Sequence, residues 1–308
     1  MRLVWIAWML ACLVVPLGAY VRVSQAGLGC PDWPGCFGQI SPRAAAGAIA
    51  ERELHQSGGP VSAAKAWREM IHRYFAALLG ALVLLLVLQR YRLHQQRLAA
   101  SLLLAGVGLQ GALGMWTVTL LLKPAVVSAH LLLGMTLAAG LAALAWGARL
   151  SRVAAPLTLR ILCWSLLVVL LLQIALGGWV SANHAALACA GFPSCNGSWW
   201  PTPRFAAAFN PTHTPDGWAL VTIQWSHRLG ALLVSCLVLA VLWRGRRQSA
   251  LRRMLLALAV VWLTQIALGM AIVLLGLPWW LAVAHNLGAL ALLSLSLVLA
   301  QRLEGEGT

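Results

Sequence analysis

Four histidines lie inside long apolar stretches of this 308-residue chain, where an ionisable side chain is costly and usually functional. They form two pairs, because adding 155 to the numbers of the first pair gives the second pair. A lone histidine could be a packing residue, but four duplicated ones favour chemistry. Two imidazoles facing each other across an apolar bundle can hold haem iron from both sides, whereas zinc needs three or four converging ligands. The residues are His72, His130, His227 and His285.

An arginine directly follows the first histidine of each pair, as Arg73 and Arg228. It can be an interfacial cation that reaches toward water, or a fork that grips haem propionates. Glu69 lies three residues before His72, so a helix would bring both to one face. Its counterpart is Thr222, and the carboxylate is therefore not duplicated. Glu69 is either a helix-start acid or a proton-transfer group beside one haem, in which case the halves have divided their work.

Two cysteine pairs share one spacing, and turn-forming proline and glycine residues lie between their members. Cys30 and Cys36 return as Cys189 and Cys195, which are 159 positions further along the chain. Such segments can fold back far enough for a disulfide. We expect two local disulfides, Cys30–Cys36 and Cys189–Cys195, that brace their loops; a redox-active first pair is the alternative.

The composition identifies the environment of these residues. Apolar residues make up 61% of the chain and charged ones 9%, and the mean hydropathy is +0.83. These values are typical of a membrane protein that crosses the bilayer several times. The formal charge of +15 does not indicate nucleic-acid binding, because the basic residues form short clusters between apolar runs, as topology signals do.

Eight apolar runs are long enough to cross a bilayer, which takes about 20 residues each. A repeat of roughly 155 residues predicts two homologous units, 1–150 and 151–308. The expected fold is all-α: two tandem four-helix bundles related by a pseudo-twofold axis along the membrane normal. The first run is not a signal peptide, because its counterpart lies in the middle of the chain. The runs are 3–23, 72–90, 99–122, 125–148, 160–181, 221–243, 253–275 and 279–300.

The basic residues also predict an orientation. Thirteen arginines lie at the ends of the runs that include both termini, against six arginines and lysines at the opposite ends. Both termini are therefore expected in the cytoplasm, and the cysteine loops, 24–68 and 182–220, on the outer side, where disulfides can form. Four further histidines have no matched partner and are expected to be solvated, with His184, near the second cysteine pair, as the candidate exception. They are His55, His94, His184 and His213.

The ordered set of motifs resembles the haem A synthases, in the bacterial branch whose outer loops carry paired cysteines. The resemblance covers nearly the whole chain and is carried by the four histidines, Glu69 to Arg73, His227-Arg228 and residues 27–36. It implies oxidation of the C8 methyl group of haem O to a formyl group. It further implies a substrate site at His72 and His130 beside Glu69, and a haem b cofactor on His227 and His285.

The resemblance also implies a place and partners in the cell. The place is the bacterial cytoplasmic membrane, and the partners are haem O synthase, an electron-transfer protein and further copies of the chain. Two other functions stay open from the residues alone. A di-haem b-type cytochrome would relay electrons without catalysis, but it has little use for a carboxylate in one half only. A haem chaperone would leave the substituents of its haem unchanged. The second cysteine loop has Ala190 to Phe192 where the first has Pro31 to Trp33, so an equivalent redox role there is not implied.

Overall fold

A computed structural model describes residues 2–56, 58–93, 97–147, 149–212 and 214–305. His94 and His213 lie outside these ranges. Within them, eight helices are long and apolar enough to cross a membrane, as predicted. They are α1 (Arg2–Val23), α3 (Ala63–Arg92), α4 (Arg97–Thr119), α5 (Pro124–Gly147), α6 (Leu157–Ala182), α8 (Gly217–Gly245), α9 (Arg252–Leu274) and α10 (Trp279–Arg302).

Local chemistry sets where several of these helices begin. The Ser62 hydroxyl accepts a hydrogen bond from the Lys65 N–H at the start of α3, and the Asp216 carboxylate does the same for the Ala219 N–H at the start of α8. Both are side-chain caps that satisfy backbone donors left free in the first turn. Pro124 opens α5, where a missing N–H costs nothing.

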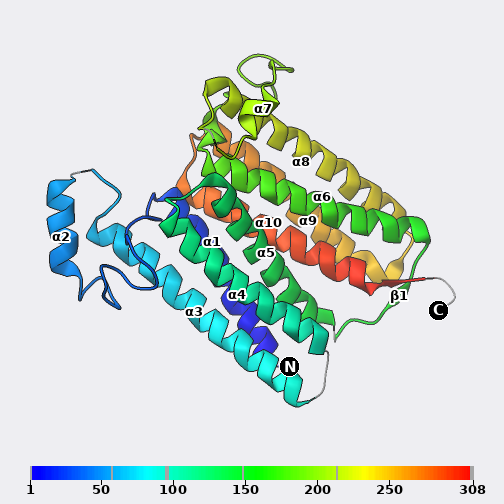
Figure 1. Ribbon diagram of the computed structural model, residues 1–308. Coiled ribbons are helices and arrows are strands. Elements are labelled where there is room, and N and C mark those ends of the chain that lie inside the picture. The colour runs from blue at the N-terminus through cyan, green and yellow to red at the C-terminus, as the bar shows by residue number, and fades with distance from the viewer. Residues whose placement is uncertain (1, 57, 94–96, 148, 213, 306–308) are drawn as a thin grey trace. The chain divides into compact units, whose positions relative to one another are not determined.

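The chain forms two compact units, residues 1–137 and 138–308, which are described separately. Their boundary falls inside α5, whereas the repeat predicted units that meet at residue 150. In the first unit α3 packs against both α1 and α4 (Figure 1). It begins nine residues before the predicted apolar run, so Glu69 is helical. The predicted outer loop also contains a helix, α2 (Ala46–His55), which packs its buried Ile49 against the segment around the first cysteine pair.

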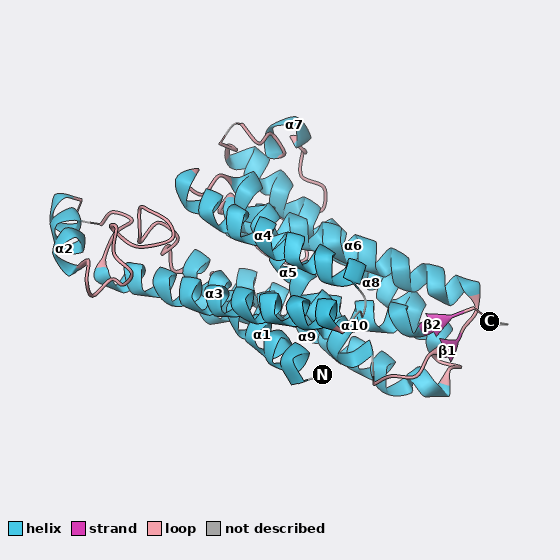
Figure 2. Cartoon of the chain, turned by 60° about the horizontal axis from the view of Figure 1, so that its bottom comes forward, coloured by secondary structure: helices cyan, strands magenta, loops and turns pink. Residues whose placement is uncertain are grey.

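The second unit contains a ring of four helices in addition to the C-terminal part of α5. Helix α6 packs against α8 and α10, and α9 packs against the same two, so α8 and α10 lie diagonally across the ring. Between α6 and α8 are the short helices η1 (Ala185–Leu187) and α7 (Phe205–Ala208), and η2 (Ser249–Leu251) precedes α9. Two short strands, β1 (Val153–Ala154) and β2 (Leu303–Glu304), pair in parallel and join the segment before α6 to the end of α10 (Figure 2).

Candidate functional site

The two histidine pairs are divided between the two units. His72 lies on α3 and His130 on α5, in the part of that helix that belongs to the first unit. In the second unit His227 and His285 lie on α8 and α10, the diagonal helices of the ring. Within each pair the two imidazoles are near enough to interact electrostatically. Cofactor sites of helix bundles are built in this way, from side chains on facing helices.

Each histidine ring lies against a glycine of a neighbouring helix. A Cβ atom at Gly18 would be 3.0 Å from His72 Cε1, and one at Gly177 would be 3.2 Å from His227 Cε1. The same holds for Gly114 against His130, at 3.3 Å, and for Gly269 against His285, at 3.1 Å. These separations are tighter than ordinary van der Waals contact. Only glycine therefore lets the helices approach closely enough to support the rings in these positions.

The ring nitrogens are suited to a ligand. Nδ1 of His72, His130 and His285 is enclosed and makes no hydrogen bond of normal geometry within the described part of the chain. A buried nitrogen without a partner is costly unless something completes its coordination. No cluster of three or more His, Cys, Asp or Glu side chains was found among the described residues. Paired imidazoles in an apolar bundle fit a haem iron, which takes one protein ligand on each side.

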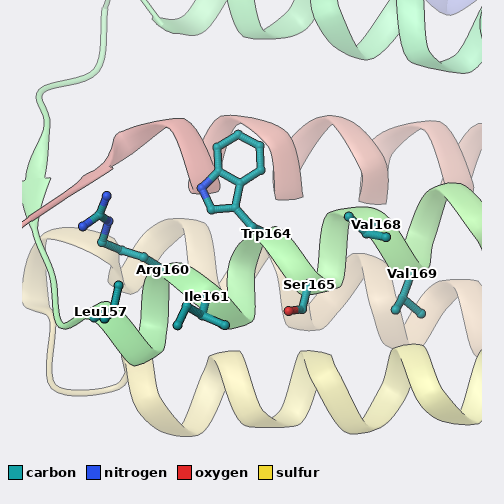
Figure 3. Close-up of a pocket in the computed structure, with 7 residues that line it drawn as sticks. All are labelled: Leu157, Arg160, Ile161, Trp164, Ser165, Val168 and Val169. Atoms are coloured by element: carbon teal, nitrogen blue, oxygen red, sulfur yellow. The ribbon is translucent and has the colours of Figure 1, made fainter.

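A hollow of about 500 Å³ lies along α6, away from these histidines. Figure 3 shows its lining side chains, which all come from α6 between Leu157 and Val169. Ile161, Trp164 and Val168 are exposed apolar side chains, as on any helix face that meets lipid. None of the predicted site residues lines it, so the hollow is not part of the site.

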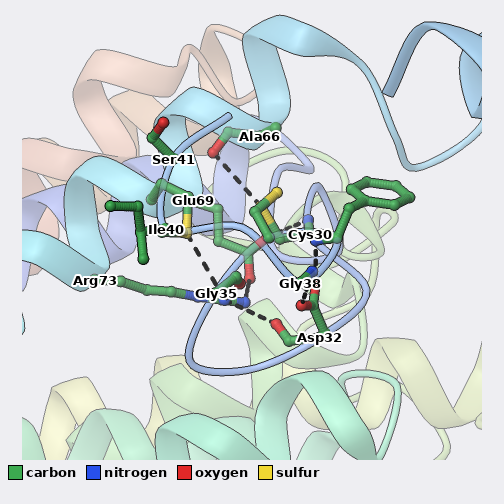
Figure 4. Close-up of a disulfide and its surroundings, with 12 residues drawn as sticks. Cys30, Asp32, Gly35, Gly38, Ile40, Ser41, Ala66, Glu69 and Arg73 are labelled. Atoms are coloured by element: carbon green, nitrogen blue, oxygen red, sulfur yellow. Dashed lines mark hydrogen bonds and ion pairs between the residues drawn. A yellow bond between two sulfur atoms is a disulfide. The ribbon is translucent and has the colours of Figure 1, made fainter. Parts of the chain in front are cut away.

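Glu69 binds the first cysteine loop rather than standing free beside His72. Its carboxylate is only 4% exposed. Oε2 accepts a hydrogen bond of 2.9 Å from the Cys30 N–H, and Oε1 forms an ion pair of 2.5 Å with Arg73 (Figure 4). Arg73 in turn donates to the carbonyl oxygens of Asp32 at 2.8 Å and Gly35 at 2.5 Å. One buried ion pair thus fixes the loop to α3.

Arg228 makes the corresponding contact in the second unit. It donates to the carbonyl oxygens of Ser194 at 2.9 Å and Cys189 at 2.7 Å. Thr222, which replaces Glu69, is buried and accepts the backbone N–H of Arg204 at 2.9 Å instead. Both units therefore hold their loop through an arginine, but among the described residues only the arginine of the first unit, Arg73, also pairs with a carboxylate. The sequence did not reveal these contacts, because they depend on where the loop carbonyls point.

Both predicted disulfides are present, with Cα–Cα distances of 4.8 Å for Cys30–Cys36 and 4.7 Å for Cys189–Cys195. The second cysteine of each opens a two-residue hairpin that requires positive φ at both turn positions. The turns are Phe37-Gly38, with φ of 52° and 70°, and Asn196-Gly197, with φ of 51° and 80°. Glycine at the second position explains why this residue recurs in the repeat.

Comparisons with known proteins cover almost the entire chain. Residues 1–297 match the family model described as cytochrome oxidase assembly protein, COX15-CtaA. A haem A synthase of Shewanella oneidensis is 39% identical over 315 residues, which span 97% of this chain and 95% of that protein. One from Methylobacterium radiotolerans is 33% identical, covering 97% and 88%. One from Erythrobacter litoralis is 31% identical, covering 95% and 94%.

Proposed function

This chain belongs to the cytochrome oxidase assembly protein family COX15-CtaA, and we propose that it is a haem A synthase that oxidises the C8 methyl group of haem O to a formyl group. It is a multi-pass membrane oxidoreductase. The observation that carries the proposal is the match to haem A synthases over 97% of the chain. The duplicated histidine pairs supply the sites that such a reaction needs.

The reaction defines what the protein must provide. Conversion of a methyl group to an aldehyde, with the oxygen atom taken at the level of water, releases four electrons and four protons. It is pictured as two successive hydroxylations, which give a geminal diol, followed by loss of water. The chain must therefore hold the substrate in one orientation and accept protons near the methyl carbon.

We assign haem O to the first unit, where His72 and His130 would hold its iron. The support is Glu69, which has no counterpart in the second unit. Its carboxylate is anchored by Arg73 and by the Cys30 N–H. A carboxylate held in this way can accept a proton released at the substrate and can move one between the two hydroxyl groups of the diol. Arg73 keeps the carboxylate in place and joins it to the loop.

We assign a resident haem b to the second unit, with His227 and His285 as ligands. The support is the ring of helices, in which α8 and α10 face each other diagonally. Haem b bound there would supply one-electron transfer. Thr222 at the position of Glu69 leaves this unit without the matching carboxylate, as suits a relay. Arg228 and Arg73 are our candidates for propionate contacts, because a guanidinium has five donors and the loop carbonyls do not engage all of them.

We further propose that both termini lie in the cytoplasm and that the two disulfide loops face outward. The unequal distribution of arginine between the two sets of helix ends supports this orientation. An oxidising outer compartment is also where the two disulfides would persist. Proposed partners are haem O synthase, as the source of substrate, an electron-transfer protein and further copies of the chain.

The deciding experiment is extraction of haem from the purified protein, followed by chromatography with mass detection. Haem B together with haem O, haem A or a hydroxylated intermediate supports the synthase. Haem B alone, at two per chain, would instead identify a di-haem cytochrome that relays electrons. Exchangeable haem at both sites, with unchanged substituents, would identify a haem chaperone.

A further inference from the structure

Three of the four histidines share a neighbour that the fourth lacks. The glycine under each ring is preceded, four residues earlier on the same helix, by a partly buried residue. In three cases that residue is a glutamine, and in the fourth it is Val14. The pairs on the histidine-supporting helices are Gln110 with Gly114, Gln173 with Gly177, Gln265 with Gly269, and Val14 with Gly18.

Two of the three glutamines, Gln173 and Gln110, contact a histidine through the side-chain amide. Gln173 Nε2 donates to the His227 carbonyl oxygen at 2.9 Å and lies 3.1 Å from ring nitrogen Nδ1. Gln110 Nε2 donates to the His130 carbonyl oxygen at 3.1 Å and lies 3.4 Å from Nε2 of that ring. In each of these two pairs one amide donates to the backbone of the histidine and lies beside its ring, which restricts rotation of the ring.

Each glutamine also occupies a notch in the histidine-bearing helix. The notch is a glycine three or four residues after the histidine: Gly134, Gly230 or Gly288. A Cβ at Gly134 would be 2.9 Å from the Gln110 amide nitrogen. At Gly230 and Gly288 it would overlap the amide oxygens of Gln173 and Gln265 outright. The glutamine and its glycine thus form one unit, which we call the amide clamp.

The helix pair that carries His72 lacks both halves of the clamp. Val14 stands in place of the glutamine, and Phe75 and Ala76 stand where the notch glycine would be. Gly18 still supports the ring, with its Cβ position 3.0 Å from His72 Cε1. The glycine contact with the ring is therefore kept at all four histidines, whereas the glutamine and its notch glycine are missing only at His72.

We propose that Gln110, Gln173 and Gln265 are positioning residues that hold His130, His227 and His285 in their ligating orientation. His72 is then the ligand that dissociates from the iron when haem enters or leaves. This inference rests on the proposed haem ligation. A resident cofactor benefits from clamps on both sides, and the second unit has them at His227 and His285. A substrate must enter and its product must leave. The first unit clamps one ligand, His130, and leaves the other able to swing away from the iron.

The first test installs the missing clamp in the full-length protein. Val14→Gln with Ala76→Gly supplies the amide and its notch, and Val14→Leu with Ala76→Gly is the matched control without an amide. The readout is the rate at which haem O passes from the loaded protein to an excess of apomyoglobin. Changes in groups that orient a metal ligand alter affinity about 10-fold to 100-fold. We expect the glutamine variant to release haem O about 10-fold more slowly than the leucine control; equal rates would overturn the inference.

The second test removes clamps from the cofactor site. Gln173→Leu and Gln265→Leu should each shift the electron paramagnetic resonance of the resident low-spin haem, because the angle between the imidazole planes changes. Each should also speed loss of that haem about 10-fold. An unchanged spectrum in both variants would overturn the positioning role, even if the first double variant failed to fold.

The two tests are separable from the proposed function. If the protein holds haem but forms no haem A, the synthase proposal fails while the release rates and spectra still report on the clamps. If the products are those of a synthase and the clamp variants behave like their controls, only the clamp proposal fails.

Discussion

The backbone N–H of Cys30 donates to the carboxylate of Glu69, 39 residues later in the chain, at 2.9 Å. This bond joins the first disulfide to the only membrane-helix carboxylate in the described part of the chain. Glu69, which we propose to be catalytic, therefore also helps to hold the first cysteine loop in place. Substitutions at either residue must be designed to separate the two roles.

Glu69→Gln keeps the size of the side chain and an oxygen that can accept the Cys30 N–H, but it removes the negative charge. We expect haem in the second unit to remain bound and turnover of haem O to fall by at least about 100-fold, the usual range for loss of an acid–base group. Haem A formation in membranes measures the effect. Glu53→Gln, on the exposed face of α2, is the matched control. Normal turnover in Glu69→Gln would remove this carboxylate from the mechanism.

His285→Ala removes one proposed ligand of the resident haem. The low-spin absorption and paramagnetic signals of that haem should disappear, because an iron with one remaining imidazole, from His227, cannot stay six-coordinate through the protein alone. His55→Ala, an exposed histidine at the end of α2, should leave both signals intact. Unchanged signals in His285→Ala would overturn the assignment of the cofactor unit.

Gly177→Val tests the support under His227. The new side chain begins 3.2 Å from the imidazole Cε1 and must push the ring out of position, because the remaining valine atoms extend further. We expect loss of haem from the second unit with haem O binding in the first unit preserved. Gly217→Ala is the control, since a Cβ there meets no atom within 4 Å. Full haem content in Gly177→Val would mean that the ring does not lie on this glycine.

The two disulfides should differ in their effect on activity. Replacing both cysteines of either pair with serine removes a short cross-link worth about 2 kcal/mol in the chain-entropy estimate, and both variants should unfold at a lower temperature. Only the Cys30/Cys36 variant should also lose turnover, because without the cross-link the loop holds the Cys30 N–H, which donates to Glu69, less firmly in place. Equal losses of turnover in both variants would contradict this link. Loss of turnover without any change in thermal stability would favour the redox-active alternative.

Much of the architecture could be predicted because the bilayer constrains it strongly. The eight spanning helices follow from run length and composition alone, and both disulfides follow from the repeated spacing of cysteine, proline and glycine. The exact helix ends did not follow. Helix α3 begins at Ala63 because Ser62 caps it, and its first turns lie outside the apolar run.

The finer arrangement of the site depended on contacts between distant residues. Arg73 and Arg228 were predicted as propionate contacts, a role that stays a proposal, and the structure adds that both grip loop carbonyls. The 155-residue repeat aligns Gln110 with Gln265. That Gln173 and Val14 hold the equivalent positions, four residues before a glycine, becomes clear only from the structure, in which each of these glycines faces a histidine ring.

The pairing of β1 with β2 has a consequence for biogenesis. Val153 pairs with Leu303, so the two strands are 150 positions apart. At the ordinary pace of translation, the first strand emerges on the order of ten to thirty seconds before its partner. This pairing can therefore form only after Leu303 has been synthesised, when the sequences of all eight spanning helices have already been translated. Arg302 stabilises the pairing of β1 with β2 by donating to the Ser151 carbonyl oxygen at 3.0 Å. A chain that stops before Leu303 would contain all eight spanning helices but lack β2, so the segment before α6 could not be joined to the end of α10 in this way.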